Sequence, residues 1–376
     1  MPDREPLTGP RVRADHVGSL LRPAELAEAR RRHLADEQLH SGPALRDLED
    51  RLISDVVAMQ AEVGLPLATD GEFRRSFWHY DFLDLLDGVS IRHRPTTAGL
   101  QFAGTTLRPF FPAITGTVGF SADHPMVDHF RSLAAVCPTL PKISIPGPST
   151  VHFRTPADSI APERYGDLDV LFDDIAAAYA TAVAAFYDAG CRYLQLDDIF
   201  FAYLCDPDQR AAKQAEGFDP DDLIVRYAAL LDAAIRDRPA DLTIAMHMCR
   251  GNFRSTHAAS GGYDPAVDAI FNSTSVDVYY MEYDTERAGG LEPLRLLPAG
   301  DKRVMLGLIT TKTPELESID ELARRVDEAA LYADLDQLGI APQCGFASTE
   351  EGNLLTEDDQ RAKLDLVVRA ADRIWS

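Results

Sequence analysis

The sequence predicts an α/β fold, and specifically a (β/α)8 TIM barrel. Short apolar runs, often rich in β-branched residues, recur along the chain, and most are separated by amphipathic helical patterns. Each run also ends in polar residues or glycine, as strands do at the catalytic edge of a barrel. Strands that alternate with helices favour a parallel sheet covered by helices. The eight predicted strands are 15–20, 66–73, 142–149, 192–198, 242–249, 277–284, 303–310 and 339–346.

The helical patterns repeat apolar residues every three to four positions, so each predicts a helix with one buried face. Gly64 and Gly190 stand just past two of them, where a glycine commonly ends a helix. The stretch 205–220 interrupts the alternation, and we expect a surface excursion there. The predicted helices are 44–64, 174–190, 221–237, 318–333 and 358–375.

Residues 87–141 depart from the barrel pattern between the second and third predicted strands. They contain threonine, glycine and alternating apolar residues, which predict an inserted β-hairpin. A chain of 376 residues with 45% hydrophobic content can bury a large core, and no boundary requires two domains. We therefore expect residues 1–376 to form one TIM-barrel catalytic domain with an insertion at about 87–141.

Charge and cysteine content limit the partners and the compartment. The net charge is −23, with acidic residues spread along helical segments, so the surface should repel nucleic acid and anionic membranes. Five cysteines are an odd, sparse count that argues against a disulfide framework and for a reducing compartment. No apolar run approaches ~20 residues, and the charged N-terminus lacks the apolar core of a secretory signal. These features predict a cytoplasmic protein that binds a small molecule or another protein.

Four soft-metal ligands stand at the ends of predicted strands. His247 and Cys249 share one strand, and Glu282 and Cys344 end two others. Alternate residues of a strand share a face, so the imidazole and the first thiolate point the same way. His-x-Cys alone is weak evidence, because buried cysteine is common. Two sulfurs, one nitrogen and one carboxylate favour Zn²⁺ over Mg²⁺ or Ca²⁺, and the wide spacing predicts a site built by the finished fold.

Several longer motifs, in the same order, resemble the catalytic barrel of cobalamin-independent methionine synthase, and in particular its short, barrel-only relatives. The resemblance covers nearly the whole chain from residue 12 onward. It is carried by HVGSLLRP (16–23), DGEFRRSFWHYDFL (70–83), IPGPST (145–150), LQLDD (194–198), HMCRGNF (247–253), MEYDTERAG (281–289), LGLITTKTPELES (306–318) and PQCGFASTEEGNLL (342–355).

The resemblance implies a zinc-dependent transfer of a methyl group to the sulfur of homocysteine, giving methionine. It implies that carboxylates at Glu72 and Asp197 hold the amino group of the substrate, and that its carboxylate lies near Ser19. The implied zinc ligands are His247, Cys249, Glu282 and Cys344.

Elementary chemistry agrees with that implication. A free thiol is mostly protonated at neutral pH, and a Lewis-acid zinc that binds the sulfur makes it nucleophilic. Glu72 and Asp197 are suited to grip an ammonium, although a salt bridge to Arg74 or Arg75 is the alternative role for these carboxylates. Asp198 is predicted either to orient a metal-ligating histidine or to cap the next helix.

The sequence departs from the family pattern at positions that would serve the methyl donor. The family has a histidine near the end of the seventh strand that protonates the leaving group. Here Lys312 or a threonine stands in its place, and Lys312 is the candidate proton donor. A tryptophan that stacks on folate near the third strand is missing, and His152 and Phe153 lie nearby. Trp78 and His79, with Tyr80, offer another stacking surface. The donor is therefore predicted to be a methylfolate or a methylcorrinoid, free or carried on a protein.

Two alternatives stay open. Relatives of this family open epoxides with coenzyme M, which carries a sulfonate and no amino group, and carboxylates at Glu72 and Asp197 would repel it. The second alternative is a zinc-holding or protein-interaction barrel without catalysis. The lone histidines His124, His129 and His257 are assigned no role, because a loop histidine is usually solvated.

Overall fold

The computed structural model describes residues 12–35, 43–93, 101–102, 105–106 and 110–376. The first eleven residues, where the sequence predicts no secretory signal, lie outside this set. Part of the predicted insertion, within 94–109, also lies outside it.

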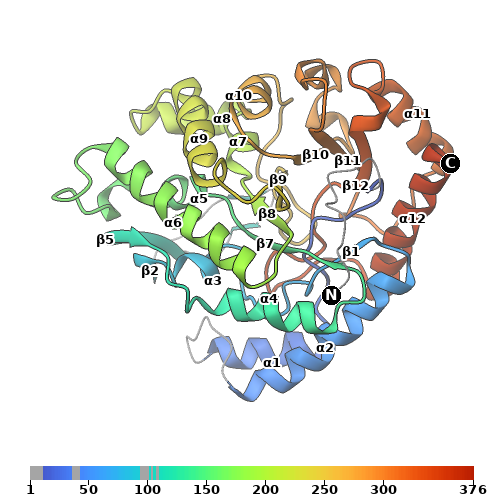
Figure 1. Cartoon of the computed structure of the whole chain (residues 1–376), viewed down its shortest axis with the longest axis horizontal. Coiled ribbons are helices and arrows are strands. Elements are labelled where there is room, and N and C mark those ends of the chain that lie inside the picture. Colours follow the sequence, from blue (N-terminus) through green and yellow to red (C-terminus); the bar gives the residue numbers. More distant parts are fainter. Residues whose placement is uncertain (1–11, 36–42, 94–100, 103–104, 107–109) are drawn as a thin grey trace.

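Six strands form one parallel sheet at the centre of the molecule (Figure 1). Their order is β12-β11-β10-β9-β8-β7, and every neighbouring pair is parallel. The register places Asp197 of β8 beside His247 of β9. All six fall inside predicted strands or within one residue of them. Their bounds are β7 Ile143–Pro146, β8 Tyr193–Asp197, β9 Thr243–Met248, β10 Val278–Glu282, β11 Arg303–Ile309 and β12 Leu338–Pro342.

The first two predicted strands are shorter than expected. The run 66–73 contains only β1 (Leu67–Ala68), which pairs in parallel with β6 (Leu140–Pro141), just before β7. The prediction of a strand at 15–20 was wrong, because the only regular pairing nearby is a single parallel bridge between Ala14 and Ile340. The reason is local: Gly18 has φ +136°, which takes the backbone out of the extended conformation.

Segment 13–20 nevertheless forms backbone hydrogen bonds with neighbouring segments on both of its sides. Ile340 N donates to Arg13 O at 2.8 Å, on the side of β12. On the other side, Leu20 N donates to Gly71 O at 3.0 Å. The backbone of this segment therefore lies between β12 and the loop after β1.

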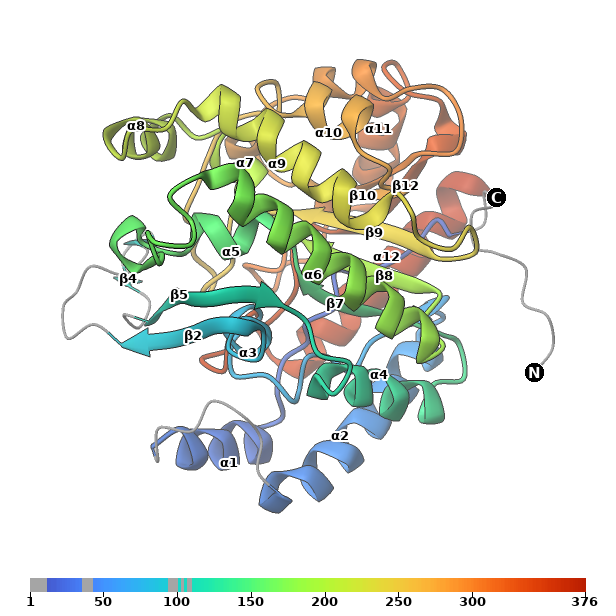
Figure 2. The same cartoon turned by 60° about the vertical axis from the view of Figure 1, so that its left-hand side comes forward.

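The region between β1 and β7 contains an antiparallel pair, β2 (Asp87–His93) with β5 (Phe110–Gly119), which projects from the parallel sheet (Figure 2). The short strands β3 (Gln101–Phe102) and β4 (Thr105–Thr106) also pair antiparallel. The predicted extent of the β insertion was too long, since α4 (Pro125–Val136) occupies its last third. This helix begins with a proline in its first turn, and His124 Nδ1 accepts from Met126 N at 3.2 Å.

The helices lie around the outside of the parallel strands (Figures 1 and 2). Helix α6 contacts α9, α9 contacts α10, and α11 contacts α12. The predicted excursion at 205–220 contains a helix, α8. The bounds are α1 Ala24–Ala35, α2 Pro43–Glu62, α3 Tyr80–Leu83, α5 Ser149–Phe153, α6 Leu168–Asp188, α7 Phe200–Tyr203, α8 Pro207–Ala215, α9 Pro220–Ile235, α10 Val267–Ser273, α11 Ile319–Ala329 and α12 Glu357–Trp375, with 3₁₀ turns η1 Ala157–Ser159, η2 Glu286–Ala288, η3 Glu292–Leu296 and η4 Leu335–Gln337.

Helix α6 differs from the expectation that no apolar segment approaches membrane-spanning length. Its 21 residues are long and apolar enough to cross a bilayer by length and composition. Half of its apolar window is buried in the fold, where it contacts α9 and β5. These contacts are those of a core helix.

A fully buried ion pair lies among the strands. Lys142 Nζ is 2.9 Å from Asp15 Oδ1, and both side chains are 0% exposed. The same ammonium donates to His16 O, and Tyr280 OH donates to the second oxygen of Asp15. Tyr193 OH is 2.8 Å from Tyr280 OH. The pair and the two tyrosines thus join the N-terminal segment to β8, to β10 and to the residue just before β7.

We expect Lys142→Met to lower the free energy of unfolding by about 3–5 kcal/mol, because it leaves the carboxylate of Asp15 buried without its counter-charge. The double variant Asp15→Asn/Lys142→Met should recover part of that loss. Urea unfolding measures both values. Equal losses in the single and double variants would show that packing, rather than the uncompensated charge, sets the cost.

Candidate functional site

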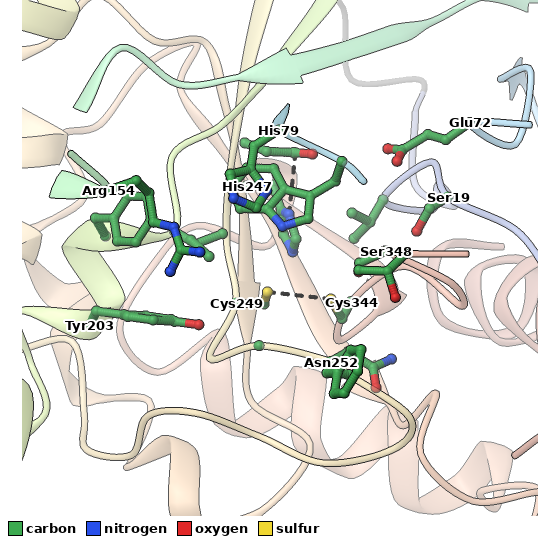
Figure 3. Close-up of a pocket in the computed structure, with 18 residues that line it drawn as sticks. Ser19, Glu72, His79, Arg154, Tyr203, His247, Cys249, Asn252, Cys344 and Ser348 are labelled. Atoms are coloured by element: carbon green, nitrogen blue, oxygen red, sulfur yellow. Dashed lines mark hydrogen bonds and ion pairs between the residues drawn. The ribbon is translucent and has the colours of Figure 1, made fainter. Parts of the chain in front are cut away.

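Three of the four predicted metal ligands meet in a buried cluster. The ligand atoms of His247, Cys249 and Cys344 all lie within 4.8 Å of one another. The two sulfurs are 3.3 Å apart, and the dashed line in Figure 3 joins them. His247 lies on β9 and Cys249 directly after it, whereas Cys344 follows β12. Strand alternation therefore delivers the first two groups to one side, and the fold brings the third from 95 residues away.

The cluster fits a soft divalent ion. His247 Nε2 is buried and has no hydrogen-bond partner among the described residues, while its Nδ1 is 3.2 Å from Asp197 Oδ1. A carboxylate on one ring nitrogen with the other left for the ion is the usual arrangement of a metal-ligating histidine. Two ligand atoms that lie ~2.3 Å from one tetrahedral ion are roughly 3.8 Å from each other. The ligand atoms of these three residues lie within 4.8 Å of one another, which is compatible with that separation. The three groups therefore have both the chemistry and the spacing of zinc ligands.

The three groups share protons in a way that favours a bound cation. The hydrogen bond from Cys344 lowers the pKa of Cys249 well below its usual range, and the same bond raises the pKa of Cys344. Burial alone would lower the pKa of His247, but the Cys249 thiolate and the bond to Asp197 outweigh it and raise that pKa to about 10. The site therefore holds negative charge on sulfur even in a buried setting.

Glu282, the fourth predicted ligand, is not part of this group of three. It ends β10 beside β9, and its side chain is fully buried. One oxygen accepts from Arg250 N at 2.8 Å, and the other pairs with Arg287. Its carboxylate is thus engaged by two donors, and its role as a metal ligand stays a prediction.

A pocket opens above the sulfurs and contains the predicted substrate-binding residues Ser19, Glu72 and Asp197 (Figure 3). Asp197 Oδ1 accepts from Gln195 Nε2 at 2.7 Å, in addition to its contact with His247. Both bonds hold this carboxylate at the pocket wall. Acidic groups therefore lie beside the soft-ligand cluster, as the sequence predicts.

The backbone of Glu72 adopts an unfavourable conformation. Its φ is +62°, a region that non-glycine residues rarely adopt, and Asp70 Oδ1 accepts from its backbone N at 2.9 Å. Oε1 accepts from Ser144 Oγ at 3.0 Å and lies 3.6 Å from Arg75, so the alternative salt bridge is also present. Oε2 is buried without a hydrogen-bond partner. Burial, more than the nearby charge of Asp197, raises the pKa of Glu72 to about 7.

The two residues predicted to be catalytic lie outside the pocket lining. Asp198 was predicted as one candidate to orient a metal-ligating histidine, but in the structure Asp197 makes the contact with His247. Asp198 instead accepts from Ser149 and packs on Gly147, and burial raises its pKa to about 7. Lys312 Nζ is buried without a hydrogen-bond partner near Glu282, and its role as a proton donor stays a prediction.

Sequence reasoning missed several residues of the pocket wall. Arg154 ends α5, Tyr203 lies on α7 and Asn252 follows β9, so all three come shortly after the C-terminal ends of strands. That position was the available signal. Trp78 and His79 line the pocket, as the sequence suggested for a stacking surface. The pocket lining does not include Tyr80, His152 or Phe153.

Comparison with known proteins gives consistent matches along the chain. The family model for the catalytic domain of cobalamin-independent synthase matches residues 15–373. The uncharacterized protein YxjH of Bacillus subtilis (strain 168) is 46% identical over 366 residues, which cover 96% of this chain and 94% of that protein. A 5-methyltetrahydropteroyltriglutamate–homocysteine methyltransferase of Bacillus velezensis is 25% identical over 89% of this chain, which corresponds to 40% of that longer protein.

A solved structure also resembles the fold over its full length. It is the crystal structure of a Listeria monocytogenes protein assigned to the vitamin-B12 independent methionine synthases. The two chains are 37% identical, with a TM-score of 0.75, and the match covers 96% of this chain and 98% of that one. The match therefore includes the strand ends that carry the pocket.

The raised pKa of Glu72 predicts a stability that depends on pH. Its folded pKa of about 7 exceeds the ordinary value of 4.5, so the folded protein holds a proton that the unfolded chain releases. Stability from this carboxyl is complete below about pH 4.5 and is lost as the pH rises through about 7. Relative to Glu72→Gln, the wild type should lose about 3 kcal/mol between pH 4.5 and pH 8. Urea unfolding of both proteins measures it, and a pH-independent difference would contradict the raised pKa.

Proposed function

We propose that this chain, which belongs to the family of the cobalamin-independent synthase catalytic domain, is a zinc-dependent methyltransferase that acts on the thiol of homocysteine and forms methionine. The observation that carries the proposal is the buried group of His247, Cys249 and Cys344, which lies in the same pocket as two carboxylates. The group offers soft ligands to a metal, and the carboxylates offer a place for an ammonium group.

His247, Cys249 and Cys344 would hold the zinc ion, and Asp197 orients the imidazole through Nδ1. A zinc ion there would lower the pKa of an incoming thiol and so favour the nucleophilic thiolate. Glu282 is proposed as a further ligand. It can serve as one only if its carboxylate turns away from Arg287 or from the backbone N–H of Arg250.

The acidic side of the pocket favours an amino acid over a sulfonate as the thiol substrate. Glu72 Oε2 has no partner in the structure, and an ammonium group would satisfy it. Ser19 lines the same pocket and is proposed to lie near the substrate carboxylate. Coenzyme M would bring its sulfonate toward Glu72 and Asp197, which is unfavourable in a buried site.

We further propose that the strands close into a (β/α)8 barrel and that residues 1–376 form a single domain. The hydrogen bonds of segment 13–20 to Ile340 and to Gly71 support closure, since they connect β12, at one end of the strand order, to the loop after β1, and β1 pairs with β6 just before β7, at the other end. All five cysteines are free thiols, which supports a reducing compartment such as the cytoplasm.

Metal content tests the ligand assignment. The wild type should retain about one zinc per chain after dialysis, and Cys249→Ser and Cys344→Ser should each weaken zinc binding by at least about 100-fold. Cys137→Ser, outside the cluster, is the matched control and should retain the metal. Elemental analysis and competition with a chelator give the values. A full equivalent in both cluster variants would refute the assignment.

Calorimetric titration at pH 8, where Glu72 is mostly ionised, tests the thiol substrate. Homocysteine should bind the zinc-loaded protein, and Glu72→Gln should weaken it about 10-fold because a charge-assisted hydrogen bond is lost. Coenzyme M should bind more weakly and should not lose affinity in that variant. The exposed Glu163→Gln serves as control. Equal affinity of the wild type for both thiols would exclude the proposed grip on an amino group.

A further inference from the structure

The pocket contains a cation to which the proposed function gives no role. Among the residues that the structure describes, Arg154 forms no ion pair, although it lines the pocket and is only partly exposed. Its Nη2 donates to Tyr80 OH at 2.5 Å, and its guanidinium carbon lies 5.7 Å from the centroid of that ring. Its Nε is buried and has no hydrogen-bond partner in the part of the chain that the structure describes. A guanidinium with unsatisfied N–H groups is a ready site for a carboxylate, which it binds through two parallel hydrogen bonds.

Arg154 lies on the side of the pocket away from Glu72. In Figure 3, Arg154 and Tyr203 lie on one side of the two sulfurs, and Glu72 and Ser19 lie on the other. The proposed amino-acid thiol occupies the acidic side. The side with Arg154 is therefore where the second substrate, the methyl donor, would approach the sulfur.

The other groups of the pocket restrict the size and character of that donor. Most lining residues are buried, and only Trp78, Arg154 and Ser348 are partly exposed, so the opening suits a small molecule. Aromatic side chains of Trp78, Phe200 and Tyr203 contribute to the lining, and the last two rings pack edge to face at 5.3 Å. Aromatic faces attract positively charged groups.

Two histidines line the pocket, and His247 is a proposed ligand of the zinc ion, which leaves His79 as the candidate for protonating a leaving amine. Burial, and then the charge of Arg154, hold the pKa of His79 well below its usual range, so this lining histidine is neutral. Lys312 is not among the lining residues. The amine of a methylated donor is a poor leaving group unless it is protonated. A sulfonium donor departs as a neutral thioether and needs no proton.

We propose that the methyl donor is a small methylsulfonium carboxylate, whose carboxylate binds Arg154 and whose sulfonium methyl group lies against the aromatic side chains of the pocket. This inference rests on the proposed methyl transfer to homocysteine and names the second substrate of that reaction.

The reaction balances without a further reactant. The homocysteine thiol first releases its proton to solvent. A lone pair of the thiolate then forms the new S–C bond to the methyl carbon, and the old C–S⁺ bond breaks with its electron pair moving to the donor sulfur. Homocysteine and the sulfonium thus give methionine, a neutral thioether and one proton.

The donor is tested with the zinc-loaded full chain and homocysteine carrying deuterium in its side chain. The donors are S-methylmethionine, trimethylsulfonium, methylcobalamin, and methylfolate as mono- and triglutamate, each with a control that lacks protein. Mass spectrometry separates deuterated methionine from any methionine released by the donor. We expect the fastest formation with S-methylmethionine and much slower formation with trimethylsulfonium, which has no carboxylate.

Variants of Arg154 separate carboxylate binding from a structural role. Arg154→Leu should raise KM for S-methylmethionine about 10- to 100-fold, and Arg154→Lys should have a smaller effect because it keeps the charge but not the paired donors. Neither variant should change the already weak reaction of trimethylsulfonium, or the calorimetric affinity for homocysteine, by more than about twofold. Arg131→Leu, on the exposed face of α4, is the matched control.

Each contrary result has a distinct meaning. Deuterated methionine formed only from methylfolate or methylcobalamin would overturn this inference and leave the proposed function intact. A loss of homocysteine affinity in both Arg154 variants would assign the guanidinium to the acceptor and also overturn it. No methionine from any donor, in a protein that holds zinc, would overturn the proposed function together with this inference.

Discussion

The parallel register of β8 and β9 is the constraint on which the site depends. It places Asp197 beside His247, and the contact between the two fixes which ring nitrogen of the histidine faces the sulfurs. Two residues further along the same strand direction, Cys249 reaches the same side. A slip of one residue between these strands would turn the imidazole away from the pocket and leave the two cysteines without their nitrogen partner. The register of the parallel strands therefore determines which side chains meet at this edge of the sheet.

A second constraint is the burial of several carboxylates around this edge. Glu72 adopts a positive φ and keeps one oxygen without a partner, and burial raises its pKa to about 7. Neither feature favours folding, so the surrounding contacts must maintain them. Arg75 and Ser144 hold the other oxygen in place. A cation that arrived beside such a group would stabilise it, as the proposed binding of an ammonium group by Glu72 requires.

The sequence predicted the parallel strands and the soft-ligand cluster because both depend on local patterns. Alternation along β9 pairs His247 with Cys249, and the end of β12 brings Cys344 to the same edge. It could not predict the partner of Glu282, because the choice between a metal and Arg287 depends on a long side chain from a later loop. Segment 15–20 failed as a strand because Gly18 turns the backbone, and α4 was missed because the whole stretch 87–141 was predicted as one β insertion. Arg154 gave no local signal beyond its place after a strand.

The balance of charge beside the cluster supplies a last argument for a divalent ion. Arg287 pairs with Glu282 and lies 3.9 Å from Asp284, and the buried ammonium of Lys312 acts on the same two carboxylates. These two cations and two anions offset one another. The charge on Cys249 is then offset by a proton on His247, and both sulfurs are buried at the pocket wall. Cys344 Sγ donates to Cys249 Sγ at 3.3 Å, and a divalent ion that replaced the shared protons would neutralise both thiolates at once, which would favour its binding between them.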